Sequence, residues 1–231
     1  MCAAEMLAII PAKGASTRLP RKNVRALGGK PLMGWTIESA LASGVFSDIV
    51  VSSEDKEILA VASQWPVKTC LRPSELAVDP AGCIHVAQYV QAKLEQEGKH
   101  YKRVAILMPT CPFRSSEDIC AAVAMAELNQ NGTVLSVAEY SHTPYNALAA
   151  NDKNNLKPII TGFFGKKTQE LPIAYRPNGG IFLMSGEVLK NASNLYVEPM
   201  HPYIMPPERS VDIDNEIDLN WAEFLLEQRK A

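Results

Sequence analysis

Long apolar runs are missing from this sequence of 231 residues. Its longest runs, such as Met6–Ile10 and Ile181–Met184, are far shorter than the roughly 20 residues of a membrane-spanning helix. Residues 1–5 carry neither the basic region nor the apolar stretch of a signal peptide, so we expect no such peptide. The net charge of −2 at pH 7 argues against a general nucleic-acid binder. We therefore expect neither a membrane nor a nucleic acid as a partner.

Cysteine patterns typical of zinc sites or disulfide frameworks are also missing. The number of cysteines is odd, no two are spaced as C-x-x-C, and the four histidines are equally scattered. The cysteines are Cys2, Cys70, Cys83, Cys111 and Cys120. Thiols without such a pattern favour a reducing compartment, so we expect a cytoplasmic protein.

What the sequence does contain is an alternation of short β-rich runs with helical apolar periodicities. Strands are expected at Met6–Pro11, Asp48–Ser52, Val67–Leu71, Val104–Met108, Thr133–Val137 and Gly180–Met184. Helices are expected at Leu32–Ala42, Lys56–Ser63, Ile84–Leu94, Ser115–Leu128 and Asp214–Gln228. This alternation predicts an α/β fold with a doubly wound, mainly parallel sheet, whose ligands bind beyond the carboxyl ends of the strands. We expect a single domain over residues 1–231.

Two of the expected helices carry more specific signals. Ser116, followed by Glu117 and Asp118, predicts a capped helix start. In the closing helix, spacings of i, i+4, i+7 and i+8 predict one buried face made of Ile217, Trp221, Phe224 and Leu225.

Residues 140–175 interrupt the alternation. Asn151–Lys157 is polar and turn-like, and Gly162–Lys167 is loop-like. We predict an excursion from the sheet, which either packs on another subunit in a homodimer or is an ordinary long surface loop.

The first expected strand leads into a basic loop. No acidic residue occurs from Met6 to Ile37, although 25 of the 231 residues are Asp or Glu. The loop contains Lys13, Gly14, Ser16, Thr17, Arg18, Arg21 and Lys22. Neither G-x-x-x-x-G-K-[ST] nor G-x-G-x-x-G follows the strand. The loop is therefore either a polyanion site, in which backbone N–H groups and cations hold phosphates, or a solvated basic surface.

Asp212 and Asp214 are two residues apart, so in an extended segment their carboxylates share one face. Such a pair suits Mg²⁺, which usually takes one or two carboxylates together with substrate phosphates. Alternatively the acidic residues cap the closing helix, since negative charge is favourable at a helix start. The basic loop elsewhere in the chain favours the metal.

Arginines flank two further expected strands. Arg72 follows Val67–Leu71, and Arg176 and Asn178 come just before Gly180–Met184. The latter two either grip a carboxylate or sugar hydroxyls, or belong to a turn with a surface arginine.

Five segments in one order together resemble the acylneuraminate cytidylyltransferase family, the CMP-sialic acid synthetases. These segments are Ile9–Asn23, Leu71–Ala77, Pro109–Arg114, Leu171–Gly179 and Val211–Asp218. The resemblance implies a doubly wound α/β domain, of the type found in nucleotide-diphospho-sugar transferases, with a dimerisation excursion. It also implies Mg²⁺-dependent transfer of CMP from CTP to the anomeric hydroxyl of a nine-carbon ulosonic acid, with release of pyrophosphate.

The same resemblance implies roles for individual residues. The positions that match catalytic ones are Lys22, Arg18 and Asp212, the two cations being those that hold the triphosphate. The positions that match nucleotide-binding ones are Lys13, Ser16, Asn23, Arg72 and Cys83. The positions expected to contact the sugar are Met108, Arg176, Asn178 and Phe182. The metal-binding pair is Asp212 and Asp214.

Several positions depart from the family pattern. Lys13 keeps the charge of the usual arginine but loses its fork of donors, and Cys83 replaces a hydroxyl. A glutamine, an arginine and an aromatic hydroxyl are replaced, where sugar contacts are expected, by Met108, Thr168 and Phe182. The substrate therefore stays open between N-acetylneuraminate and a legionaminate-type or deaminated relative. An eight-carbon KDO-type acid and a non-catalytic nucleotide-binding module are the alternatives.

Overall fold

The computed structural model describes residues 6–229. The expectation about a signal peptide falls on residues 1–5, which lie outside the described residues, as do residues 230–231.

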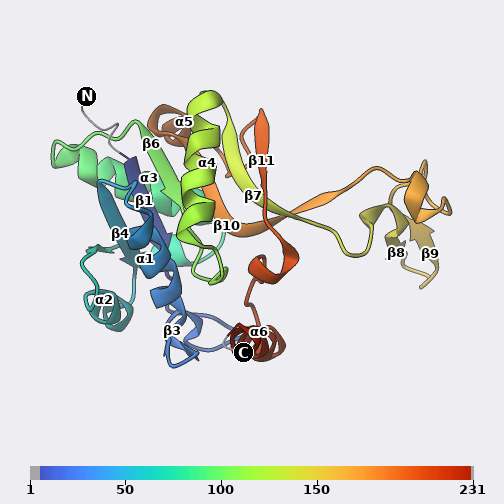
Figure 1. Ribbon diagram of the computed structural model, residues 1–231, viewed down its shortest axis with the longest axis horizontal. Coiled ribbons are helices and arrows are strands. Elements are labelled where there is room, and N and C mark those ends of the chain that lie inside the picture. Colours follow the sequence, from blue (N-terminus) through green and yellow to red (C-terminus); the bar gives the residue numbers. More distant parts are fainter. Residues whose placement is uncertain (1–5, 230–231) are drawn as a thin grey trace.

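Within the described range a seven-stranded sheet forms the centre of the molecule, in the order β11-β7-β10-β6-β1-β4-β5 (Figure 1). Its strands are β1 (Met6–Pro11), β4 (Asp48–Ser53), β5 (Lys68–Leu71), β6 (Arg103–Ile106), β7 (Thr133–Glu139), β10 (Tyr175–Ser185) and β11 (Met200–Ile204). All neighbouring strands are parallel except β10, which is antiparallel to β6 and β7. The predicted fold class is confirmed.

Within residues 6–229, five helices cover the two faces of the sheet: α1 (Leu32–Ser43), α2 (Lys56–Ala62), α3 (Cys83–Gln96), α4 (Ser116–Leu128) and α5 (Gly186–Asn191). Helix α6 (Glu216–Gln228) packs instead against the loop after β1. In β1, Ala8 and Ile10 belong to the core under α1, α2 and α4, whereas Leu7 and Ile9 belong to the core under α3 and α5. Successive side chains of a strand point to opposite faces, so a continuous apolar run is needed where both faces are buried.

Capping fixes the start of α4. The Oγ of Ser115 accepts a hydrogen bond from the backbone N–H of Asp118 at 3.2 Å, and the Asp118 carboxylate accepts one from the N–H of Ser115 at 2.9 Å. This reciprocal pairing requires the acid three residues after the cap. The cap is therefore Ser115, and the prediction of Ser116 was wrong by one residue.

The predicted buried face of α6 was wrong for three of its four residues, because only Leu225 packs against the body. Ile217, Trp221 and Phe224 are 78%, 52% and 46% exposed, and the last two rings stack on each other. The face that packs on the body is instead formed by Leu219, Ala222 and Leu226. Helix α6 carries two apolar stripes, and periodicity alone does not distinguish between them.

The sheet differs from the expectation in two strands, β10 and β11. The stretch from Tyr175 to Gly180, expected before a strand, is the first half of β10, and the register against β7 shifts between Pro177 and Phe182. Strand β11, which lies at the edge beside β7, was not expected because prolines such as Pro202 disfavour a strand reading.

Residues 140–175, here called the arm, project away from the body (Figure 1). Their strands β8 (Leu148–Ala150) and β9 (Leu156–Pro158) form an antiparallel hairpin that the sequence did not reveal. The exposed apolar side chains of the arm include Leu148, Leu156, Ile159, Phe164 and Ile173. Association of the arm with a second subunit stays a prediction.

Candidate active site

A cavity of about 340 Å³ lies at the carboxyl ends of the central strands. Its walls are the loop after β1, the segment that joins β5 to α3, and the residues after β6. Strand β1 has β4 on one side and β6 on the other, so the chain reverses its winding direction here. Such switch points are where open α/β sheets bind their ligands.

Most of the predicted site residues come together in this cavity. Those that line it are Lys13, Ser16, Arg18, Lys22, Asn23, Arg72, Cys83 and Met108. They include every predicted nucleotide-binding residue and both predicted catalytic cations.

A third apolar cluster seats the basic loop against the acidic segment that precedes α6. Leu19 and Leu27, on either side of the loop's last cations, pack with Val211 and Ile213. As a result Asp214 forms salt bridges with two basic side chains: Arg18 Nη2 and Lys22 Nζ each lie 2.8 Å from one of its carboxylate oxygens. Residues almost 200 positions apart in the sequence therefore form one charged cluster.

The two aspartates of this segment have different electrostatic environments. Burial opposes ionisation of Asp214, but hydrogen bonds and charge from Lys22 and Arg18 outweigh it and hold the pKa of its carboxyl below the ordinary value. Asp212 is exposed, yet the surrounding protein limits its hydration enough to raise its pKa, and the Asp214 carboxylate adds to the rise. Within residues 6–229 no salt bridge neutralises Asp212.

Buried polar contacts hold in place the part of the cavity lining that contains Asn23, Arg72 and Cys83. Asn23 is buried, and its Nδ2 donates to the carbonyl oxygen of Lys13 at 2.8 Å. Arg72 is buried as well and donates from Nη1 to the Ser52 carbonyl oxygen at 2.7 Å. Burial raises the pKa of the Cys83 thiol at the start of α3, although Arg72 and Lys13 act against it.

The predicted sugar-binding residues are only partly brought together. Met108 lines the cavity. Arg176 is half-buried, donates to the carbonyl oxygen of Ser210 at 3.2 Å, and is close enough to Asp212 to lower its pKa. Thr168 lies on the arm, outside the residues that line the cavity.

Asn178 and Phe182 do not line the cavity. Asn178 is fully buried: its Oδ1 accepts from Ser136 Oγ at 2.6 Å and from the Gly180 N–H at 3.0 Å, and its Nδ2 donates to Ser210 Oγ at 2.9 Å. Phe182 is a core residue beneath α3 and α5. Both side chains therefore contribute to the packing of the fold, Asn178 through its buried hydrogen bonds and Phe182 through the apolar core.

Sequence reasoning missed several residues of the site. The cavity is also lined by residues to which no role was assigned, among them Leu76, Ala77, Asp79, Ala81, Gly82 and Thr110, and Glu54 hydrogen-bonds to Gly14 and Arg72 in two of its walls. The position of Glu54 directly after β4, beside β1, is a signal that could have found it. Among the described residues no group of three or more His, Cys, Asp or Glu side chains is arranged to share a metal ion, and no helix is long and apolar enough to cross a membrane.

Together the fold and the cavity define a nucleotide-binding α/β protein with a basic loop at its switch point. Residues 7–157 match a family model described as "Cytidylyltransferase". The chain is 36% identical over 225 residues to the CMP-N,N'-diacetyllegionaminic acid synthase of Legionella pneumophila, with 96% of both chains covered. It is 30% identical to the N-acylneuraminate cytidylyltransferase of Escherichia coli, covering 98% of this chain and 53% of that one. The chain belongs to the cytidylyltransferase family, which confirms the resemblance.

A solved structure shows the same fold. The CMP:2-keto-3-deoxy-manno-octonic acid synthetase complexed with CTP superimposes with a TM-score of 0.73, over 97% of this chain and 99% of that one. The sequence identity is 16%, so this likeness concerns the fold alone.

Proposed function

We propose that this protein transfers CMP from CTP to the anomeric hydroxyl of a nine-carbon ulosonic acid and releases pyrophosphate. The relatives from Legionella pneumophila and Escherichia coli support this, since both are named for acids of this kind. The observation that carries the proposal is the cavity itself: Lys13, Arg18 and Lys22 stand on one wall, and Arg72 with Cys83 on the other. One wall suits a triphosphate and the other a nucleoside.

In this reaction the sugar hydroxyl oxygen attacks the α-phosphorus, the bond to the β-phosphate oxygen breaks, and pyrophosphate leaves on the opposite side. Negative charge grows on the leaving group, so Lys22 and Arg18 stabilise the transition state more than the bound substrate. Asp214 holds both cations beside the cavity before any nucleotide arrives. Such preorganisation avoids reorienting them during the transfer.

Asp212 and Asp214 have the donor chemistry to hold Mg²⁺. Both offer hard carboxylate oxygens, and Asp212 lacks an ion-pair partner within residues 6–229 while its pKa is raised by its surroundings and by Asp214. A divalent cation bound here supplies positive charge to the phosphate oxygens. The proposed dependence is tested by Asp212→Asn, which should weaken binding of Mn²⁺ as measured by electron paramagnetic resonance, besides lowering turnover about 10²-fold.

The decisive experiment measures pyrophosphate release with CTP, Mg²⁺ and a panel of acids. The panel contains N-acetylneuraminate, N,N'-diacetyllegionaminate, a deaminated nine-carbon acid and the eight-carbon KDO. Turnover with at least one nine-carbon acid, at a kcat/KM above that for KDO, supports the proposal. Turnover with KDO alone would favour the eight-carbon alternative, and CTP binding without turnover would favour a non-catalytic module.

We propose further that the protein is a cytoplasmic homodimer assembled through the arm. The arm projects from the body (Figure 1) and exposes the apolar side chains of Leu148, Leu156, Ile159 and Ile173, and exposed apolar surface of this kind marks association sites. Free thiols at Cys70 and Cys111 suit a reducing compartment. Light scattering should give twice the mass of the chain, and the double variant Leu156→Lys/Ile159→Lys should give the single mass. If the unaltered chain has the mass of one copy, the arm is an ordinary surface loop.

A further inference from the structure

An acidic segment at the end of β4 lies directly against the basic loop. The backbone N–H of Ala12 donates to the Ser52 carbonyl oxygen at 2.9 Å, and the N–H of Gly14 donates to Glu54 Oε1 at 2.7 Å. A Cβ on Gly14 would lie 2.8 Å from Asp55 Oδ2 and 2.9 Å from Asp55 Cβ, so a larger residue here would force the loop or Asp55 to shift. The first turn of the loop is thus seated on β4 and on the residues just after it.

The second oxygen of the same carboxylate holds the opposite wall of the cavity. Glu54 Oε2 accepts a hydrogen bond from Arg72 Nη2 at 2.8 Å. The side chains of Arg72 and Glu54 are 2% and 16% exposed, so water competes little for this ion pair. With Nη1 of Arg72 on the Ser52 carbonyl, the guanidinium is fixed at two points, and its buried Nε finds no partner within residues 6–229.

We propose that Glu54 is a positioning residue for the nucleotide. The Glu54 carboxylate binds the basic loop through Gly14 and the segment between β5 and α3 through Arg72. It therefore sets the distance between these two walls of the cavity. The inference rests on the proposed function only in taking CTP as the nucleotide. It assigns to Glu54 no contact with the substrate.

The geometry requires two acceptors at position 54. Both neighbours of the carboxylate are donors, an N–H and a guanidinium. Glutamine has the same shape but offers one acceptor oxygen and one NH₂ group. Its NH₂ group would then face either the Gly14 N–H or the Arg72 guanidinium, and two donors cannot form a hydrogen bond. Glu54→Gln is therefore a minimal change that breaks the bridge while keeping the volume of the side chain.

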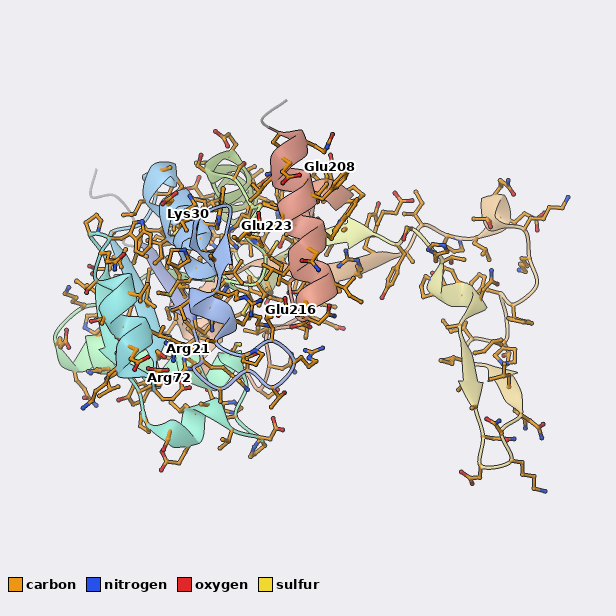
Figure 2. The ribbon with its side chains drawn as sticks, turned by 90° about the horizontal axis from the view of Figure 1, so that it is seen from below. Arg21, Lys30, Arg72, Glu208, Glu216 and Glu223 are labelled. Atoms are coloured by element: carbon orange, nitrogen blue, oxygen red, sulfur yellow. The ribbon has the colours of Figure 1, made fainter. Side chains whose placement is uncertain are left out.

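A matched control lies three residues away. Glu57 Oε2 lies 2.7 Å from Nη2 of Arg21 in the basic loop. Arg21 and Arg72 are labelled next to each other in Figure 2. The side chains of Glu57 and Arg21 are both exposed, and such pairs contribute little. Glu57→Gln removes the same charge from the same segment without touching the buried bridge.

The experiment compares the two variants by calorimetric titration with CTP alone and by steady-state kinetics. For Glu54→Gln we expect the Kd and KM for CTP to rise about tenfold or more, about 1.4 kcal/mol. The KM for the sugar acid should stay within about twofold, a change below 0.5 kcal/mol. Selectivity for CTP over UTP should fall, because Arg72 loses its fixed orientation. Glu57→Gln should behave as the unaltered enzyme does.

Equal behaviour of the two variants would overturn the proposal, and so would a loss in Glu54→Gln that affects kcat and both KM values alike. If Glu54→Gln does not fold, Gly14→Ala provides the second test: its Cβ would meet Asp55, the residue after Glu54, and by moving the Gly14 N–H away from Glu54 should raise the Kd for CTP by a similar factor. Unchanged CTP affinity in Gly14→Ala contradicts the proposal. If no sugar acid is turned over by the unaltered protein, the proposed function fails, but the CTP titrations still decide the role of Glu54.

Discussion

Removing the side chain of Asn178 should destabilise the protein more than it changes sugar binding. In Asn178→Ala the buried N–H of Gly180 loses its acceptor, which costs about 1–3 kcal/mol. The lost hydrogen bonds with Ser136 and Ser210 cost about 1 kcal/mol each. We therefore expect a loss of about 4 kcal/mol in the free energy of unfolding, or about 10 °C in Tm for a chain of this size.

The assay is urea unfolding followed by circular dichroism, together with the KM for the sugar acid measured well below the transition. Asn220→Ala is the control, because Asn220 is exposed on α6, where such a change is within about 0.5 kcal/mol. In Asn178→Ala the KM of the folded fraction should change by less than about threefold, or about 0.65 kcal/mol.

The opposite result would refute the structural reading of Asn178. If the unfolding midpoint stays where it is while the KM for the sugar acid rises tenfold or more, about 1.4 kcal/mol, the amide contacts the substrate. The residue would then have the role that the family resemblance implies, and its burial here would not describe the working enzyme.

Three further predictions follow from the site and its supports. Lys22→Ala should lower kcat about 10²-fold, with a smaller change in the KM for CTP, because charge grows on the leaving pyrophosphate; a pure KM effect in steady-state assays would show that Lys22 only binds. Met108→Gln should shift the ranking of kcat/KM among three nine-carbon acids toward N-acetylneuraminate, since it restores an amide to the cavity wall; an unchanged ranking counts against this. Burial raises the pKa of Asp118, but hydrogen bonds from Arg209, the Ser115 backbone and Tyr203 outweigh it and hold the pKa below its ordinary value, so its contribution is full at pH 7 and is lost as the pH falls below about 4. Asp118→Asn should thus lower the free energy of unfolding by about 3 kcal/mol at pH 7 and by less at pH 3, where the contribution has begun to be lost; equal losses in urea unfolding at both pH values would contradict the assignment.

The sequence by itself determined the α/β class and the location of the basic loop. Strands such as β1 are buried on both faces and therefore appear as continuous apolar runs, and the helices between them show their own period. The cations of the basic loop are neighbours in the chain, so their clustering is visible without a structure. The pairing of Asp212 with Asp214 on one face follows in the same way from the period of an extended segment.

Only the tertiary structure decided which side chains face the cavity and which face the core. The exposed stripe of Ile217 and Trp221 on α6 is as apolar as the buried one, and the choice between them depends on how Leu219 fits against the body. Asn178 is buried by hydrogen-bond partners far away in the sequence, Ser136 of β7 and Ser210. The bridge from Glu54 to Gly14 joins residues 40 positions apart. Each of these outcomes depends on contacts with residues that are distant in the sequence. Local periodicity shows which face of a segment can be buried, but not which residues pack against it.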